Sequence, residues 1–260
     1  MTIHSTTRLL VIDQDILGEN LLEHTRACGV DASACQCLPD CPTASYLAVY
    51  DSDGELVMAL EDMRVMGGLS PAIIKQHESR FYETGLVFVD ANLPPQSLKT
   101  VFQLAKKARV PVCADATSAS LCSNLLPFLK KIFLLTANST EASVLSGGHP
   151  EVADLNSAAA AARGFVVQGV EMAIITLAKS GVCYVTQDVN GHVPALRTQV
   201  IDPTGSGDAL TATVLFGLVN DMPLDDAVRL GVTAASLVLR YPGTVLPELS
   251  LERLYDELVI

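Results

Sequence analysis

The stretch LVFVDANLPPQSLKTVFQLAKKARVPVCADA (86–116) predicts a strand, a helix and a second strand. Residues 86–91 and 110–116 are short apolar runs of the kind found in buried strands, and a helix is expected from Pro95 to Ala108 between them. Parallel neighbours need such a crossover, because a tight turn can join only antiparallel strands. The stretch therefore predicts a βαβ unit.

The alternation continues toward the C-terminus. Further strands are expected at IFLLTA (132–137) and MAIITLA (172–178), and VCYVTQ (182–187) follows Gly181 so closely that it reads as a hairpin partner. Helices are expected over residues 154–168, 206–220, 224–240 and 251–258. This rhythm predicts an α/β fold with a mainly parallel sheet flanked by helices.

The first third of the chain has a different pattern. SYLAVYD (45–51) and LVMALE (56–61) flank the turn signal Ser52-Asp53-Gly54, which favours a β-hairpin. We expect residues 41–66 to form a small β flap, or lid, on a single domain that spans residues 1–260.

Composition excludes several classes of protein. The chain has 260 residues, 49% of them hydrophobic, which is enough for a large core. Its net charge of −12 repels phosphate backbones, so nucleic acid is not an expected partner. Every apolar run is broken by charge, Gly or Pro, and the N-terminus lacks the apolar core of a signal peptide. We expect a cytoplasmic protein with no membrane partner.

Seven cysteines are scattered through the chain. Cys35, Cys37 and Cys41 crowd together, but they lack a fourth ligand and the CxxC spacing of a zinc site, which favours free thiols. Cys113 and Cys183 lie in apolar runs and are expected in the core.

The segment DPTGSGD (202–208), followed by the apolar run ALTATVLFGL, carries the strongest chemical signal. Gly205 and Gly207 permit tight backbone geometry at the start of a helix, where unpaired amides and the helix dipole favour an anion. Asp208 falls in the first turn of that helix. A carboxylate beside an anion hole suits a kinase, which needs a base for the acceptor hydroxyl and donors for the phosphoryl group.

Other interpretations of this segment fit less well. A GxGxxG fingerprint would need Gly where Leu210 stands, and a nucleophile elbow around Ser206 would need Gly in place of Thr204 and Asp208. A GxxxxGK[ST] loop does not occur in the sequence. The plain alternative is a capped helix in which Asp208 only favours the dipole.

DPTGSGDALTATVLFGL resembles the C-terminal signature of the ribokinase, or PfkB, carbohydrate-kinase family. Asn138-Ser139-Thr140-Glu141 resembles the family's N-x-x-E segment, and ITLAKSGVCYV (175–185) resembles its nucleotide loop, with Ala178 where Gly is usual. DILGENLLEHTRACGVD (15–31) resembles a helix near the start of the family's chain. The resemblance thus covers nearly the whole sequence and implies the ribokinase-like fold.

The resemblance also implies roles for individual residues. Asp208 would take the proton from the acceptor hydroxyl, and the amides of Gly205, Ser206 and Gly207 would form the anion hole. ATP and Mg²⁺ would be the cofactors, with K⁺ as a further candidate. The remaining implied assignments are Asn138 and Glu141 for Mg²⁺ and phosphates through water, Thr176, Gly181 and Thr204 for the nucleotide site, and Asp202, Thr204 and Gly243 for a monovalent cation. Asn138 and Glu141 also fit a helix capping box, and both interpretations can hold together.

Three segments are most similar to pseudouridine kinases: residues 41–63, 89–94 and 112–129. Asp90 and Asn92 follow a strand, and ligands of parallel sheets gather beyond the carboxyl ends of strands. These two residues are therefore expected to face the acceptor, although a strand end and an Asx turn would explain them equally. The expected partner is a nucleoside or sugar, and a homodimer stays open.

The family pattern normally opens with a first strand and a GG segment, and here the sequence begins at what resembles the second strand, near RLLVIDQD. Relative to that pattern the chain is N-terminally shortened. Three functions are therefore open: a kinase for pseudouridine, another PfkB-type kinase for ribose, fructose or adenosine, and a nucleotide-binding pseudokinase without turnover.

Overall fold

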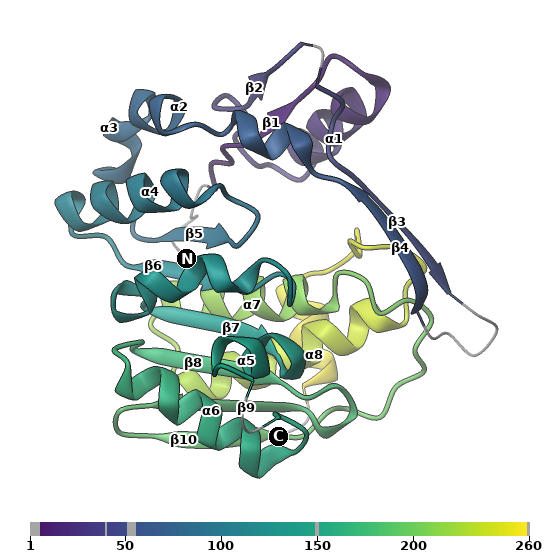
Figure 1. Ribbon diagram of the computed structural model, residues 1–260. Coiled ribbons are helices and arrows are strands. Elements are labelled where there is room, and N and C mark those ends of the chain that lie inside the picture. The colour runs from purple at the N-terminus through teal and green to yellow at the C-terminus, as the bar shows by residue number, and fades with distance from the viewer. Residues whose placement is uncertain (1–5, 40, 51–55, 149–150, 259–260) are drawn as a thin grey trace. The chain divides into compact units, whose positions relative to one another are not determined.

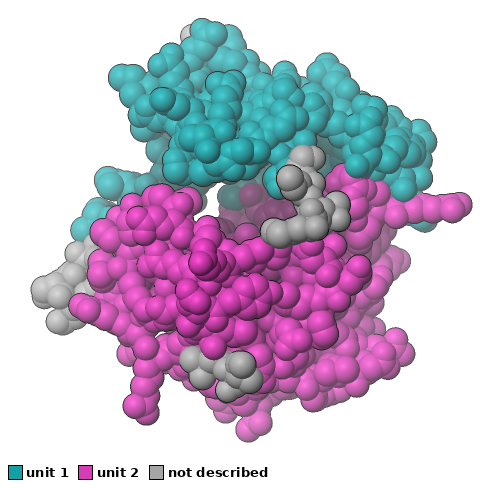
Figure 2. Space-filling model, turned by 180° about the vertical axis from the view of Figure 1, so that it is seen from behind, with its two compact units in different colours: residues 1–83, 92–108 teal, residues 84–91, 109–260 magenta. Residues whose placement is uncertain are grey.

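The computed structural model describes residues 6–39, 41–50, 56–148 and 151–258. The chain forms two compact units, which Figure 2 distinguishes by colour. Unit 1 contains residues 1–83 and 92–108, and unit 2 contains residues 84–91 and 109–260. The chain passes between them after Glu83, Ala91 and Ala108, so neither unit is a continuous stretch of sequence.

Unit 2 is built on a six-stranded sheet with the order β10-β9-β8-β7-β6-β5. Its strands are β5 (Val87–Asp90), β6 (Val112–Asp115), β7 (Leu134–Asn138), β8 (Met172–Thr176), β9 (Val182–Thr186) and β10 (Asn190–Val193). Strands β5 to β8 are parallel, whereas β9 pairs antiparallel with β8, and β10 antiparallel with β9. The predicted α/β fold and the hairpin at Gly181 are confirmed, and the complete sheet is mixed.

Helices cover both faces of this sheet (Figure 1). Helix α6 (Leu155–Val167) packs on β8 and β9, and α8 (Leu224–Leu239) packs against α7 (Ser206–Val219) on the opposite face. The remaining helical segments of unit 2 are η2 (Cys122–Lys131), α5 (Ser139–Leu145), η3 (Ala178–Ser180) and α9 (Leu251–Glu257). The long predicted helices therefore exist, within one or two residues of their expected ends.

The core between the sheet and the α7–α8 pair is made of side chains from five strands, β6 to β10, and from both helices. It includes Leu134, Ile174, Val214 and Val228, all fully buried. Cys113 and Cys183 are also buried in unit 2, as the sequence predicted. This core fixes the start of α7 against the sheet and so positions the residues that follow the glycine turn.

Unit 1 combines small sheets with helices. Its elements are β1 (Val11–Ile12), α1 (Ile16–Ala27), β2 (Gln36–Cys37), β3 (Ser45–Tyr50), β4 (Leu56–Asp62), η1 (Arg64–Gly68), α2 (Pro71–Gln76), α3 (Glu78–Phe81) and α4 (Pro95–Ala108). Strands β1 and β2 pair in parallel across α1, which Asp15 caps by accepting a hydrogen bond from the amide of Gly18 at 2.7 Å. Helix α4 has the bounds that the sequence predicted.

Strands β3 and β4 form the predicted antiparallel hairpin, a two-stranded sheet of its own. The predicted turn at residues 52–54 lies outside the described residues. Apolar side chains such as Leu47, Val57 and Leu60 are more than half exposed, so the hairpin is not part of the apolar core.

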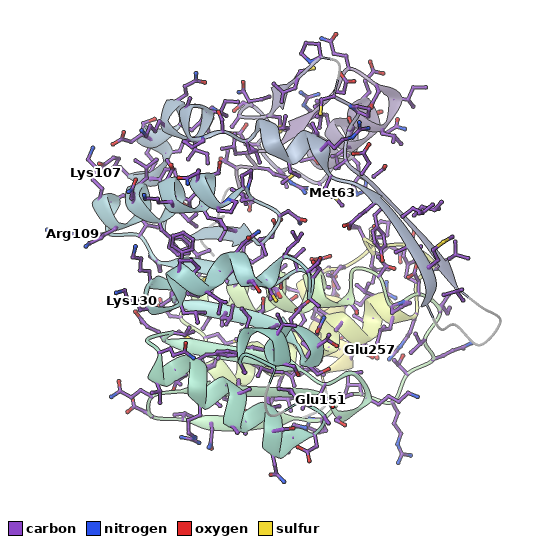
Figure 3. The ribbon with its side chains drawn as sticks, viewed as in Figure 1. Met63, Lys107, Arg109, Lys130, Glu151 and Glu257 are labelled. Carbon is purple, nitrogen blue, oxygen red and sulfur yellow. The ribbon has the colours of Figure 1, made fainter. Side chains whose placement is uncertain are left out.

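The chain re-enters unit 2 at Arg109, whose side chain is directed away from the ribbon (Figure 3). Its φ of 61° is in the left-handed region. Across the described part of the chain, every helix is too short or too polar to cross a bilayer.

Candidate active site

The glycine turn before α7 has the geometry that its sequence predicts. Gly205 has φ of 83°, and a Cβ there would lie 2.0 Å from the carbonyl oxygen of Thr244. Only glycine fits such a close approach of two backbones. The turn is braced on its other side by Asp202, whose carboxylate accepts a hydrogen bond from the amide of Thr204 at 2.8 Å. The structure thus places Thr244, the neighbour of Gly243, beside the turn, and the role of Asp202, Thr204 and Gly243 toward a monovalent cation stays a prediction.

The first turn of α7 offers space for a ligand. A Cβ at Gly207 would meet no atom within 4 Å. The amide and the hydroxyl of Ser206 both donate to the carbonyl oxygen of Pro203, at 3.3 and 2.8 Å, so this residue partly serves the turn itself. The amides of a helix start and the helix dipole attract an anion. The turn therefore combines open space with the electrostatics that a phosphate requires.

Asp208 is exposed in the first turn of α7, where the sequence placed it. One turn later, the hydroxyl of Thr211 donates to the hydroxyl of Thr136 on β7 at 3.4 Å. Thr136 in turn donates to the carboxylate of Asp115 on β6 at 2.6 Å. This chain of hydroxyls ties the beginning of α7 to the middle of β7 and to the carboxyl end of β6.

Asp115 is a site residue that the sequence reasoning did not single out. Burial raises the pKa of its carboxyl group, hydrogen bonds from Thr136 and Thr117 oppose that shift, and the charges of Asp208 and Asp90 raise the pKa further. Asp90 and Asp115 are paired in register across β5 and β6. The carboxyl group of Asp115 therefore interacts with those of Asp90 and Asp208 at the carboxyl end of β6.

Asn138 and Glu141 form the capping box that the sequence left open as one interpretation. The Asn138 side-chain oxygen accepts from the Glu141 amide at 2.9 Å, and the Glu141 carboxylate accepts from the amide and the side-chain nitrogen of Asn138, both at 2.8 Å. Glu141 is 5% exposed, and burial, together with the charge of Asp115, raises its pKa. Its oxygens retain lone pairs, so the box can still accept from waters.

Within the described ranges, His, Cys, Asp and Glu side chains do not form a group of three or more that could hold a metal ion directly. The predicted role of Asn138 and Glu141 was contact through water, which needs no such group. Mg²⁺ usually keeps several waters and takes only one or two carboxylates from the protein. The arrangement fits that kind of site.

The predicted nucleotide loop lies at the end of β8. Thr176 is the last residue of that strand and pairs in register with Asn138. Gly181 has φ of 89°, and a Cβ there would lie 2.1 Å from the carbonyl oxygen of Val193. His192 donates from its Nε2 to the carbonyl oxygen of Ser180 at 2.6 Å and so supports the loop. The structure thus brings Thr176 and Asn138 together at one edge of the sheet.

Asp90 and Asn92 belong to different units. Asp90 is the last residue of β5 in unit 2, and Asn92 begins the unit 1 segment that leads to α4. Their common role toward an acceptor stays a prediction.

Residues 3–250 match the sequence model of the pfkB family of carbohydrate kinases. The chain belongs to this family. The pseudouridine kinase of Escherichia coli K12 is 30% identical over 250 residues, which cover 94% of this chain and 77% of that protein. The uncharacterized sugar kinase YeiI of the same organism is 29% identical over 233 residues, which cover 88% of this chain and 62% of that protein.

Among solved structures, Arabidopsis thaliana ribokinase complexed with ribose and ATP superimposes with a TM-score of 0.83. It is 21% identical, and the match covers 98% of this chain and 82% of that chain. The ribokinase-like fold is therefore confirmed. Members of the pfkB family are phosphotransferases that act on hydroxyl groups of sugars or nucleosides, which confirms the predicted class of enzyme.

Proposed function

We propose that this pfkB kinase transfers the γ-phosphoryl group of ATP to the hydroxymethyl group of pseudouridine, giving pseudouridine 5′-phosphate and ADP. The observation that carries the phosphoryl transfer is the position of Asp208, directly after an open glycine turn at a helix start and close enough to Asp115 for its charge to raise the pKa of that carboxyl group. The acceptor is inferred from the similarity to a pseudouridine kinase over 94% of the chain.

Asp208 takes the proton of the acceptor hydroxyl. The oxygen of that hydroxyl bonds to the γ-phosphorus, and the bond between the γ-phosphorus and the bridging oxygen that leaves with ADP breaks. A base within hydrogen-bond reach of the attacking hydroxyl is the general requirement for such a step. The amides of Gly205 and Gly207 stabilise the charge on the transferred group, because they are fixed before the reaction begins, and the amide of Ser206 contributes a hydrogen bond that it shares with the Pro203 carbonyl oxygen. Asp90 and Asn92 orient the acceptor.

Mg²⁺ supplies charge neutralisation on the phosphates when it is bound. Asn138 and Glu141 would hold it through water, using the lone pairs that the capping box leaves on their oxygens. Thr176, Gly181 and Thr204 border the nucleotide, and Asp202, Thr204 and Gly243 form the candidate loop for K⁺. ATP is proposed from the glycine turn, since the likeness to ATP-bound ribokinase at 21% identity carries the fold alone.

The test is an ADP-release assay with Mg-ATP and pseudouridine, uridine, ribose, fructose or adenosine as acceptor. We expect the highest kcat/KM with pseudouridine, a product phosphorylated at the 5′-oxygen by ³¹P NMR, and loss of turnover with EDTA. A higher kcat/KM for another acceptor would replace pseudouridine with that acceptor. ATP binding without turnover on any of them would identify a pseudokinase and refute the proposal.

A further inference from the structure

Thr117 has a backbone conformation that β-branched residues rarely adopt. Its φ is 65°, in the left-handed region, and it follows β6 by two residues. A β-branched residue there is a genuine outlier, and such conformations persist only where surrounding contacts hold them. The side chain is exposed, so burial of its methyl group does not explain the conformation.

The contacts that hold Thr117 join two strand ends. Its amide donates to the carboxylate of Asp115 at 2.7 Å, and its hydroxyl accepts from the amide of Ala91 at 3.0 Å. The same hydroxyl donates to the carbonyl oxygen of Asp115 at 3.3 Å. The left-handed backbone lets one residue direct its amide to β6 and its hydroxyl to the end of β5.

The segment held in this way is the one that follows Asp90. Ala91 is fully buried, so its amide depends on Thr117 for a partner. Its carbonyl oxygen accepts from the side-chain nitrogen of Asn124 at 3.1 Å. Two consecutive peptide groups after Asp90 are thus fixed by side chains that lie beyond β6.

We propose that Thr117 is a positioning residue for the acceptor: it fixes the Asp90–Ala91 peptide and the Asp115 carboxylate relative to each other. The proposal rests on the function proposed above, in which Asp90 orients the acceptor. Misplacement of a positioning group by about 1 Å can cost up to about a hundredfold in rate. Thr117 does not itself take part in the transfer, and it acts on the acceptor rather than on ATP.

The first test compares Thr117→Val with Thr117→Ser. Valine keeps the shape but removes the hydroxyl, leaving the buried Ala91 amide without its partner, and we expect the KM for the acceptor to rise about tenfold or more. The KM for ATP should stay within about twofold, because the glycine turn is untouched. Serine keeps the hydroxyl and should restore the acceptor KM.

Thr233→Val is the matched control. Thr233 is a buried threonine on α8 whose hydroxyl donates to the carbonyl oxygen of Arg229 at 3.0 Å. Its substitution should lower Tm without changing either KM, which is also the result that a purely structural role of Thr117 would give. A folded Thr117→Val variant with the acceptor KM of the wild type overturns the proposal.

Asn124→Ala tests the same segment from its other side if Thr117→Val does not fold. It removes the donor to the Ala91 carbonyl oxygen and should also raise the acceptor KM while sparing that for ATP. Unchanged acceptor KM in this variant counts against the proposal. A wild type that turns over no acceptor overturns the proposed function and this inference together, whereas turnover with unaffected variants overturns the inference alone.

Discussion

The backbone of Thr244 passes so close to Gly205 that a Cβ at Gly205 would lie 2.0 Å from the Thr244 carbonyl oxygen. Two residues further on, a Cβ at Gly207 would have no atom within 4 Å. The two glycines of one turn therefore have different reasons for being glycine. The first serves the fold, and the second leaves the space in front of the helix start open.

We predict that Gly205→Ala destabilises the protein and Gly207→Ala does not. A left-handed alanine costs about 1–2 kcal/mol, and the contact with Thr244 adds to that, so the loss should be at least about 2 kcal/mol. Gly207→Ala should change the free energy of unfolding by less than about 0.5 kcal/mol. Urea denaturation of both variants tests the pair, and equal losses would contradict it.

Gly207→Val should abolish ATP binding while the protein stays folded. The β-branched side chain would occupy the open space in which the phosphates are proposed to lie, and its Cβ would have no atom within 4 Å. Isothermal titration calorimetry measures the affinity, and circular dichroism checks the fold. Wild-type affinity for ATP in a folded Gly207→Val variant would mean that the phosphates bind elsewhere.

Local sequence signals predicted the elements that depend on local patterns. The helix Pro95–Ala108, the hairpin of β3 and β4 and the antiparallel pairing of β9 all follow from runs of residues near one another in the chain. Strand β10 was missed because Asn190–Val193 is short and largely polar. Strands β1 and β2 have two residues each and pair across a helix, which no local pattern encodes.

The same contrast between local patterns and distant contacts holds for the residues of the candidate site. The glycine turn, Asp208 and the Asn138–Glu141 box are contiguous motifs, so the sequence revealed them. Asp115 and Thr117 were missed because the contacts that link them to other elements are distant in sequence: Asp115 accepts from Thr136, and Thr117 accepts from Ala91, 26 residues away. One signal could have found Asp115, since it ends a strand of the parallel sheet just as Asp90 does.

Ala178→Gly should stabilise the protein. Ala178 has φ of 46°, at the position where the family usually carries glycine. Relief of left-handed strain gains about 1–2 kcal/mol, while the greater freedom of glycine in the unfolded chain costs about 0.5–1 kcal/mol. We expect a net gain of about 0.5–1 kcal/mol by urea denaturation. Ala212→Gly, at an exposed site within α7, is the matched control and should lose about 1 kcal/mol.

Asp115→Asn should stabilise the protein at neutral pH but not in acid. Because burial raises the pKa of Asp115 above its ordinary value of 3.8, the folded state holds the proton more tightly than the unfolded state. The contribution of Asp115 to stability is complete below the pKa that its carboxyl group has in the unfolded state. It is lost as pH rises through the pKa of the folded state, because the buried carboxyl group then becomes charged. The Tm of Asp115→Asn minus that of the wild type should therefore widen from pH 4 to pH 8.

Asp154→Asn is the control, because its effect on Tm should depend on pH in the opposite direction. Hydrogen bonds from Ser157 lower the pKa of Asp154, so its ionised form favours the folded state, and its contribution appears as pH rises. Its substitution should lower Tm at neutral pH relative to acid. A difference in Tm between Asp115→Asn and the wild type that is constant across this range would contradict the burial of an ionised Asp115.

Asp208→Asn should separate catalysis from binding. Asparagine is almost isosteric but cannot accept the acceptor proton, so kcat should fall by about 10²–10⁴-fold or more. ATP affinity should change little, because the proposed anion hole consists of backbone amides. The substitution should also lower the pKa of Asp115, since the charge of Asp208 is one of the causes that raise it. If Asp208 only favoured the helix dipole, asparagine would leave turnover nearly unchanged. Measurements of kcat, ATP affinity and Tm on this variant decide the matter, and a kcat within a few-fold of the wild type would remove Asp208 from the mechanism.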